Sequence, residues 1–120
     1  MKKTEAIELY SVLRELKNGN MSREALTEFI LMRIKLKAIF DEYEKVRQEI
    51  AEQTKPEKWK EGDDITEWDK RFQSTLGKWL NEDIENIETN ILSNDDIIEL
   101  VTKNDLVGWM QDKLFEKLTK

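Results

Sequence analysis

The sequence predicts an all-α protein, mainly because apolar residues recur every three or four positions along most of the chain, as they do in amphipathic helices. Only 4 of the 120 residues are glycine, so helix-weakening positions are few. Charged residues make up 38% of the chain, against a usual share of about 25%, and the hydrophobic share is also 38%. We therefore expect a helix-rich single domain over residues 1–120 with a small core. Its predicted parts are a helical hairpin (1–54), a linker (55–65) and a C-terminal helical part (66–120).

The first helix is expected over residues 4–17. Its apolar positions are one turn apart, at steps of three, four and three: Ala6, Leu9, Leu13 and Leu16. The Asn18-Gly19-Asn20 segment predicts the stop, because glycine readily adopts the left-handed conformation that follows many helix ends. Ser22 is a suitable N-cap for the next helix. A tight helical hairpin follows from this pattern.

The second helix, from Ser22 to about Gln53, carries the clearest pattern of the chain. Its heptad seam consists of Ala25, Phe29, Met32, Leu36, Ile39, Tyr43, Val46 and Ile50. A second apolar row widens the stripe in the first half only, which predicts two neighbours there: Leu26, Ile30, Ile34 and Phe40. Such a helix is about 47 Å long, whereas a compact chain of this size spans about 35 Å. The protein should therefore be elongated, or the helix should bend.

The end of this seam needs a partner, since the first helix is only about 20 Å long and covers the first half alone. Tyr43, Val46 and Ile50 must then be covered by a later segment of the chain or by another subunit. The second alternative predicts a homodimer. The first is equally open, because residues 66–118 contain enough apolar side chains to cover the seam.

Residues 55–65 should form a polar connection, because Pro56 ends the preceding helix. Trp59 is the only apolar residue with a large side chain between Glu57 and Asp64 and is a candidate anchor for a protein partner. A third helix is expected over about 66–80, with a capping box formed by Thr66 and Asp69. Its apolar positions have helical spacing: Trp68, Phe72, Leu76, Trp79 and Leu80.

The remaining segments are expected to be helical. Residues 81–92 continue a four-three rhythm, which favours helix over extended chain in spite of several weak helix formers. Ser93 should cap a short helix, and Asn104-Asp105 permits a break before the last one. Gly108 inside that last helix would cost about 1 kcal/mol relative to alanine, which predicts close packing or a bend there.

The negative charge of the chain is concentrated in one stretch. The net charge is −6, and the 24 residues between Lys78 and Lys103 hold seven acidic residues and no basic one. Glu82, Glu85 and Glu88 are thus candidates for docking a basic protein or a cation. Alternatively, the stretch is a solvated face, or it lies against the basic residues Arg33, Lys35 and Lys37.

Composition argues against several classes of function. With no histidine and no cysteine, the chain lacks the commonest metal ligand, thiolate nucleophiles and disulfides, so we expect no cofactor, no metal site and no enzymatic activity. Nucleic-acid binding is disfavoured by the negative charge. No apolar run is long enough for a membrane span, and Met1-Lys2-Lys3 does not lead into an apolar signal segment, so a cytoplasmic location is expected.

One enzymatic alternative stays open and rests on carboxylates. Glu49 and Glu52, and likewise Glu82, Glu85 and Glu88, are three residues apart and would adjoin on a helix, where carboxylates can hold Mg²⁺. This spacing resembles the Glu-x-x-Glu arrangement of all-α nucleotide pyrophosphohydrolases of the MazG type. That resemblance implies a Mg²⁺-dependent nucleotide hydrolase as the alternative function.

A second resemblance is one of layout and covers about residues 5–100. The short first helix, the segment Phe40 to Ile50 and the later segment Leu80 to Ile87 are similar to small phage- and prophage-encoded proteins of unknown function. This implies a role in virion assembly or host interaction, and it implies a more strand-like conformation for residues 82–92. Our leading hypothesis is a non-enzymatic protein-interaction or assembly module that engages itself or another protein. A structural filler of a larger assembly is the third possibility.

Overall fold

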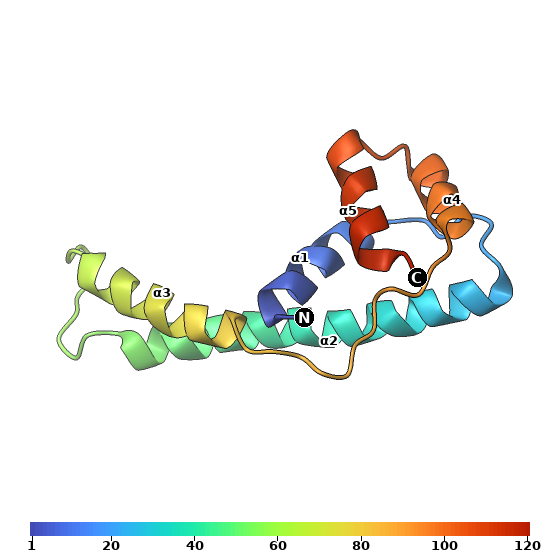
Figure 1. Ribbon diagram of the computed structural model, residues 1–120. Helices are drawn as coiled ribbons and strands as arrows, with labels where there is room; N and C mark the ends of the chain where they lie inside the picture. The colour runs from blue at the N-terminus through green and yellow to red at the C-terminus, as the bar shows by residue number, and fades with distance from the viewer.

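The computed structural model describes residues 1–120 and confirms the all-α fold. The helices are α1 (Lys3–Leu13), α2 (Arg23–Thr54), α3 (Thr66–Leu80), α4 (Asn94–Asn104) and α5 (Gly108–Leu118) (Figure 1). There is no sheet, and only two isolated β-bridges occur. None of the helices combines the length and apolar composition required to cross a membrane.

The protein is elongated along α2, as the length of this helix predicts. Its 32 residues correspond to about 48 Å, and the whole chain measures 57 × 28 × 18 Å. The radius of gyration is 18.1 Å, against about 14 Å for a compact domain of this length. The long helix therefore extends beyond any single core, and its two halves pack against different parts of the chain.

The main core lies over the N-terminal half of α2, where α1, α4 and α5 gather on one side of it (Figure 1). Its fully buried large side chains come from all four helices and the segment before α4: Leu9, Leu13, Phe29, Leu36, Leu92, Ile97, Leu100, Leu114 and Leu118. The turn before α2 touches α4, since a Cβ on Gly19 would lie 3.3 Å from the carbonyl oxygen of Glu99. Gly19 has φ = +69°, as the sequence predicts.

The C-terminal half of α2 and the antiparallel α3 form a two-helix arm, defined here as residues 43–80, at one end of the protein (Figure 1). Ile50 and Leu76 are its buried residues. Tyr43 stacks on Trp79 with ring centroids 6.0 Å apart, and the Trp68 Nε1 donates a hydrogen bond of 3.0 Å to the carbonyl of Ala51. The arm thus has a small core of its own.

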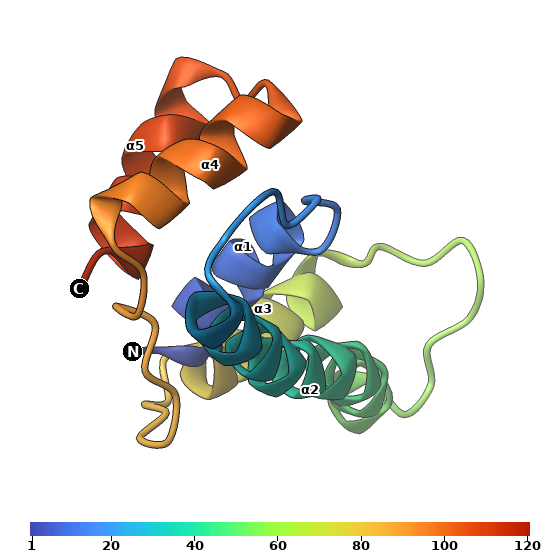
Figure 2. The ribbon, with the colours of Figure 1, turned by 90° about the vertical axis from the view of Figure 1, so that its right-hand side faces the viewer.

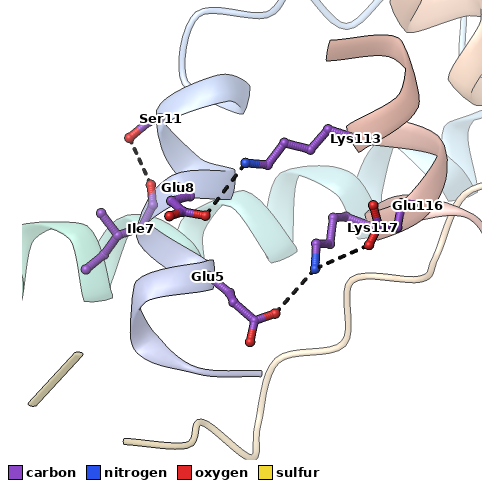
Figure 3. Close-up of polar contacts among 7 residues, drawn as sticks. All are labelled: Glu5, Ile7, Glu8, Ser11, Lys113, Glu116 and Lys117. Atoms are coloured by element: carbon purple, nitrogen blue, oxygen red, sulfur yellow. Dashed lines mark hydrogen bonds and ion pairs between the residues drawn. The ribbon is translucent and has the colours of Figure 1, made fainter. Parts of the chain in front are cut away.

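Ion pairs join α1 to α5 on the surface of the main core (Figure 3). The Lys117 Nζ lies 3.3 Å from the Glu5 carboxylate, and the Lys113 Nζ lies 3.8 Å from that of Glu8. The backbone N–H of Lys2 donates to Glu5, and this bond, together with Lys117, lowers the pKa of Glu5 below its ordinary value. The N-terminal turn of α1 is therefore tied to the C-terminal turn of α5.

Residues 81–92 are extended, so the helix that their spacing favours is wrong, and the more strand-like alternative for 82–92 agrees with the structure. It pairs with both chain ends: the N–H of Ile84 donates to the carbonyl of Met1, and the N–H of Leu92 donates to that of Leu118, each at 2.8 Å. Ile84, Ile87 and Ile91 still pack against the main core. The spacing of the isoleucines therefore indicates burial and not helix. Asn86 and Asn90 are poor helix formers, so a helix is only weakly favoured in this segment.

Several helix ends differ in detail from the sequence expectations. Ser22 and Ser93 cap α2 and α4 as predicted, by accepting hydrogen bonds from Ala25 N and Asp96 N. Thr66 forms no capping box, because both its N–H and its hydroxyl donate to the Asp64 carboxylate. The first helix ends at Leu13 rather than at residue 17. Gly108 begins α5 instead of interrupting it, so no bend occurs there.

Candidate interaction surfaces

The far end of the α2 seam is covered within the chain. Tyr43 and Val46 are half-buried and Ile50 is buried, because α3 lies along this part of α2. The later-segment alternative is therefore confirmed, and these three residues leave no uncovered seam for another subunit.

Trp59 lies at the tip of the arm and packs inward. Its ring makes an edge-to-face contact with Trp68 at a centroid distance of 5.0 Å, and the Lys55 ammonium lies 5.7 Å from the Trp59 ring. The Trp59 Nε1 is buried without a hydrogen-bond partner. A shallow hollow of about 190 Å³ opens beside this aromatic pair and is lined by Ala51, Ile65, Trp68, Asp69 and Phe72. As a partner anchor, Trp59 stays a prediction.

The acidic candidates Glu82, Glu85 and Glu88 lie on the extended segment and are exposed. Glu82 is neutralised by Lys3, whose Nζ lies 2.7 Å from its carboxylate, whereas Glu85 and Glu88 form no ion pair. The segment does run beside α2, because the Lys35 Nζ donates to the backbone carbonyl of Asn86 at 3.4 Å. None of its acids pairs with Arg33, Lys35 or Lys37, so the contact is made through the backbone.

Of the two carboxylate sets behind the hydrolase alternative, only Glu49 and Glu52 lie on a helix. Because residues 81–92 are extended, Glu82, Glu85 and Glu88 do not share a helical face. Glu49 and Glu52 are exposed on α2, and no group of three or more acidic side chains is placed to hold a metal ion. The alternative stays a prediction that no observation favours.

An apolar strip is exposed on the outer side of α2, which is the side away from the main core. It consists of Ile30, Leu31, Ile34 and Ala38, and we refer to it as the outer strip. The side chains of Ile30, Leu31 and Ile34 are 37%, 55% and 58% exposed. Ile34 follows the buried Phe29 by five residues, about 140° around the helix. Figure 2, a view almost along α2, shows α1, α4 and α5 on its upper side.

Charged residues flank the outer strip on both sides. On one side are Arg23 and Lys37, and on the other are Glu28, Lys35 and Glu42. Lys37 is held by Asp41, whose carboxylate lies 2.9 Å from its Nζ, and this contact raises the pKa of Lys37. The other four form no ion pair within the chain. The strip is thus a narrow apolar surface with a mixed-charge rim.

Comparisons with protein-family models, with curated proteins and with solved structures found no match.

Other exposed apolar side chains do not form a comparable surface. Trp109 is 60% exposed and Phe115 is 36% exposed, but they are six residues apart on α5 and point about 120° away from each other around the helix. Ile98 is 51% exposed on α4 and stands singly. Scattered residues of this kind are normal on protein surfaces, whereas contiguous rows are not. The outer strip is therefore the best candidate for an interaction surface.

Part of this strip belongs to an apolar row that the sequence shows, although the row predicts an internal neighbour and not an exposed surface. Ile30 and Ile34 belong to the second apolar row, from which a second neighbour inside the chain was expected. The structure places only Phe40 of that row against a neighbour, with its ring centroid 5.0 Å from that of Tyr10. Leu31 lies in neither row. Around the helix it lies about 60° beyond Ile34, on the side away from Ile30, so it widens the apolar surface opposite the core.

Proposed function

We propose that the protein is a non-enzymatic interaction or assembly module that binds a protein partner through the outer strip of α2. The observation that carries this proposal is the row Ile30, Leu31 and Ile34, exposed on a helix whose opposite face is already buried in the core. A helix of this kind is complete as a structural element without those three side chains. They are therefore available for a contact outside the chain.

Physical chemistry favours a helical or grooved partner for such a strip. Burying one large aliphatic side chain contributes about 1.5–3 kcal/mol, so three of them offer substantial binding energy. Aliphatic side chains one turn apart are the anchors by which a helix binds an apolar groove or a second helix. The mixed charges of Glu28 and Lys35 beside the strip would select the partner's orientation.

The layout resemblance suggests a setting for this activity in virion assembly or host interaction. The exposed Glu88 of the extended segment lies on the same side of α2 as Glu28 and Lys35, beside the strip. It would add negative charge to this edge of the contact. This role of the acidic segment is part of the proposal.

The test is affinity capture from the native host with tagged protein, followed by mass spectrometry. Ile34→Ser should abolish recovery of the bound partner, because it places a hydroxyl at the centre of the strip. Ile98→Ser is the matched control, since it removes a similarly exposed isoleucine from α4. Thermal unfolding should be nearly unchanged in both variants, because both side chains are exposed.

Two results would contradict the proposal. One is a partner that Ile34→Ser retains in full. The other is a loss of binding that Ile98→Ser reproduces to the same extent, which would indicate a general effect of an added surface hydroxyl on the fold.

A further inference from the structure

We infer that the partner of the outer strip is a second copy of this chain, bound by antiparallel pairing of the two α2 helices. This inference rests on the proposed function and specifies its partner. Its basis is that the residues along the outer side of α2 complement a reversed copy of themselves, both in apolar character and in charge. The seam that first suggested a homodimer is not involved, since α3 covers it.

The apolar positions match when the helix is reversed. Thr27, Leu31, Ile34 and Ala38 follow one another at steps of four, three and four, which is the spacing of a helix–helix contact. In an antiparallel pair centred between residues 32 and 33, Leu31 faces the partner's Ile34, and Thr27 faces the partner's Ala38. The two-fold symmetry repeats both contacts. All four side chains are exposed in the single chain.

The charges match in the same register. The side that carries Glu28 and Lys35 faces the same side of the reversed copy, so Glu28 lies opposite the partner's Lys35. On the other side, Arg23 lies opposite the partner's Glu44. Symmetry gives each pair twice. Arg23, Glu28 and Lys35 form no ion pair within the chain, whereas the Glu44 carboxylate already lies 3.9 Å from the Arg47 guanidinium.

A parallel pair is less well matched. It too has opposite charges along its edges, such as Arg23 with the partner's Glu28. However, it places each residue of the contacting helix face against its own copy. Glu24, Asp41 and Lys45 would then each meet a like charge between the helices. The antiparallel pair moves Lys45 beyond the start of the partner's helix. It leaves only Glu24 near the partner's Asp41, whose charge is offset by Lys37 at 2.9 Å.

The contact is short, and a weak dimer is expected. Four small or medium-sized side chains per chain give an interface at the low end of the specific range, below about 1,200 Å². Dimerisation should therefore be measured at protein concentrations up to about 1 mM, where even about 4 kcal/mol of binding free energy is detected. Analytical ultracentrifugation of the full chain over this range should show reversible dimers.

The first experiment uses charge reversal. Glu28→Lys and Lys35→Glu should each weaken self-association about tenfold, because each makes two like-charge contacts per dimer. An equimolar mixture of the two variants should regain native affinity. In the mixed dimer, position 28 of each chain again faces an opposite charge at position 35 of its partner. A mixture that associates no better than the single variants would overturn the antiparallel register.

The second experiment uses engineered thiols, which are unambiguous because the native chain has no cysteine. An equimolar mixture of Thr27→Cys and Ala38→Cys should form a disulfide between unlike chains under mild oxidation, faster than either variant forms one alone. Ala38→Cys cross-linking only to itself would overturn the inference in favour of parallel pairing. Both positions are exposed, so neither variant should disturb folding.

Failure of this inference can be told apart from failure of the proposed function. If the chain stays monomeric at about 1 mM while Ile34→Ser still removes a different captured protein, the second copy is wrong as the partner and the outer strip remains a binding surface. If Ile34→Ser affects neither self-association nor capture, both proposals are wrong.

Discussion

Truncation of Leu76 on α3 should separate the stability of the arm from that of the main core. Leu76 is 5% exposed and, with Ile50, is one of two buried residues that hold α3 on α2. Leu→Ala substitutions in cores cost about 2–5 kcal/mol, depending on how far the surroundings collapse. Because the neighbouring Phe72, Trp79 and Leu80 are only half-buried and free to adjust, we expect about 2–3 kcal/mol, at the low end of that range.

The assay is native-state hydrogen exchange, resolved by helix. In Leu76→Ala, amides of α3 should exchange about 30- to 150-fold faster, the equivalent of about 2–3 kcal/mol, while those of α1 change little. Lys70→Ala, which truncates a side chain that is 71% exposed on the same helix, is the control and should leave both helices unchanged. Equal acceleration in α1 and α3 would refute the reasoning, since it would mean that arm and core unfold as one unit.

Three smaller predictions concern the main core, and urea unfolding checks each of them. Gly19→Ala should destabilise the chain by more than about 1 kcal/mol, because φ is +69° and the new Cβ would lie 3.3 Å from Glu99 O; an unchanged midpoint would contradict this turn geometry. Ser93→Ala should cost about 1 kcal/mol by removing the cap of α4, and Ser93→Thr, whose hydroxyl can still accept from the Asp96 N–H and donate to the Asp96 carboxylate, should restore most of it. The pKa of Glu5 is lowered by the Lys2 N–H and by Lys117, so its contribution to stability is present above its ordinary value of 4.5 and is lost as pH falls through the lowered folded value. Glu5→Gln should therefore be less stable than the native chain at about pH 7 and equally stable at about pH 2, whereas a difference that persists in acid would contradict this ionic role.

Most helices could be predicted because each has a local cause. The seam of α2 from Ala25 to Ile50, the cap at Ser93 and the stop at Gly19 depend on neighbouring residues alone. The extended segment could not be predicted in this way. Its conformation depends on hydrogen bonds from Ile84 to Met1 and from Leu92 to Leu118, partners that are distant in sequence.

The neighbours of an apolar row are also set by parts of the chain that are distant in sequence. Periodicity shows that Tyr43, Val46 and Ile50 must be covered, but it does not say by what, and α3 was one of two open answers. For Ile30 and Ile34 periodicity suggested a second internal neighbour, because an apolar row looks the same whether a helix of the same chain or of another one packs on it. Only the arrangement of all five helices distinguishes the two cases.

The length of α2 connects these observations. A helix of 32 residues exceeds what one small core can enclose, so its successive parts have different neighbours: α1, α4 and α5 first, then α3. All of these pack on the inner side, which leaves Ile30, Leu31, Ile34 and Ala38 exposed on the outer side of the first half. If the reversed pairing of Leu31 with the partner's Ile34 is correct, this outer side joins two elongated subunits while the arms, at opposite ends of the dimer, remain free for other contacts.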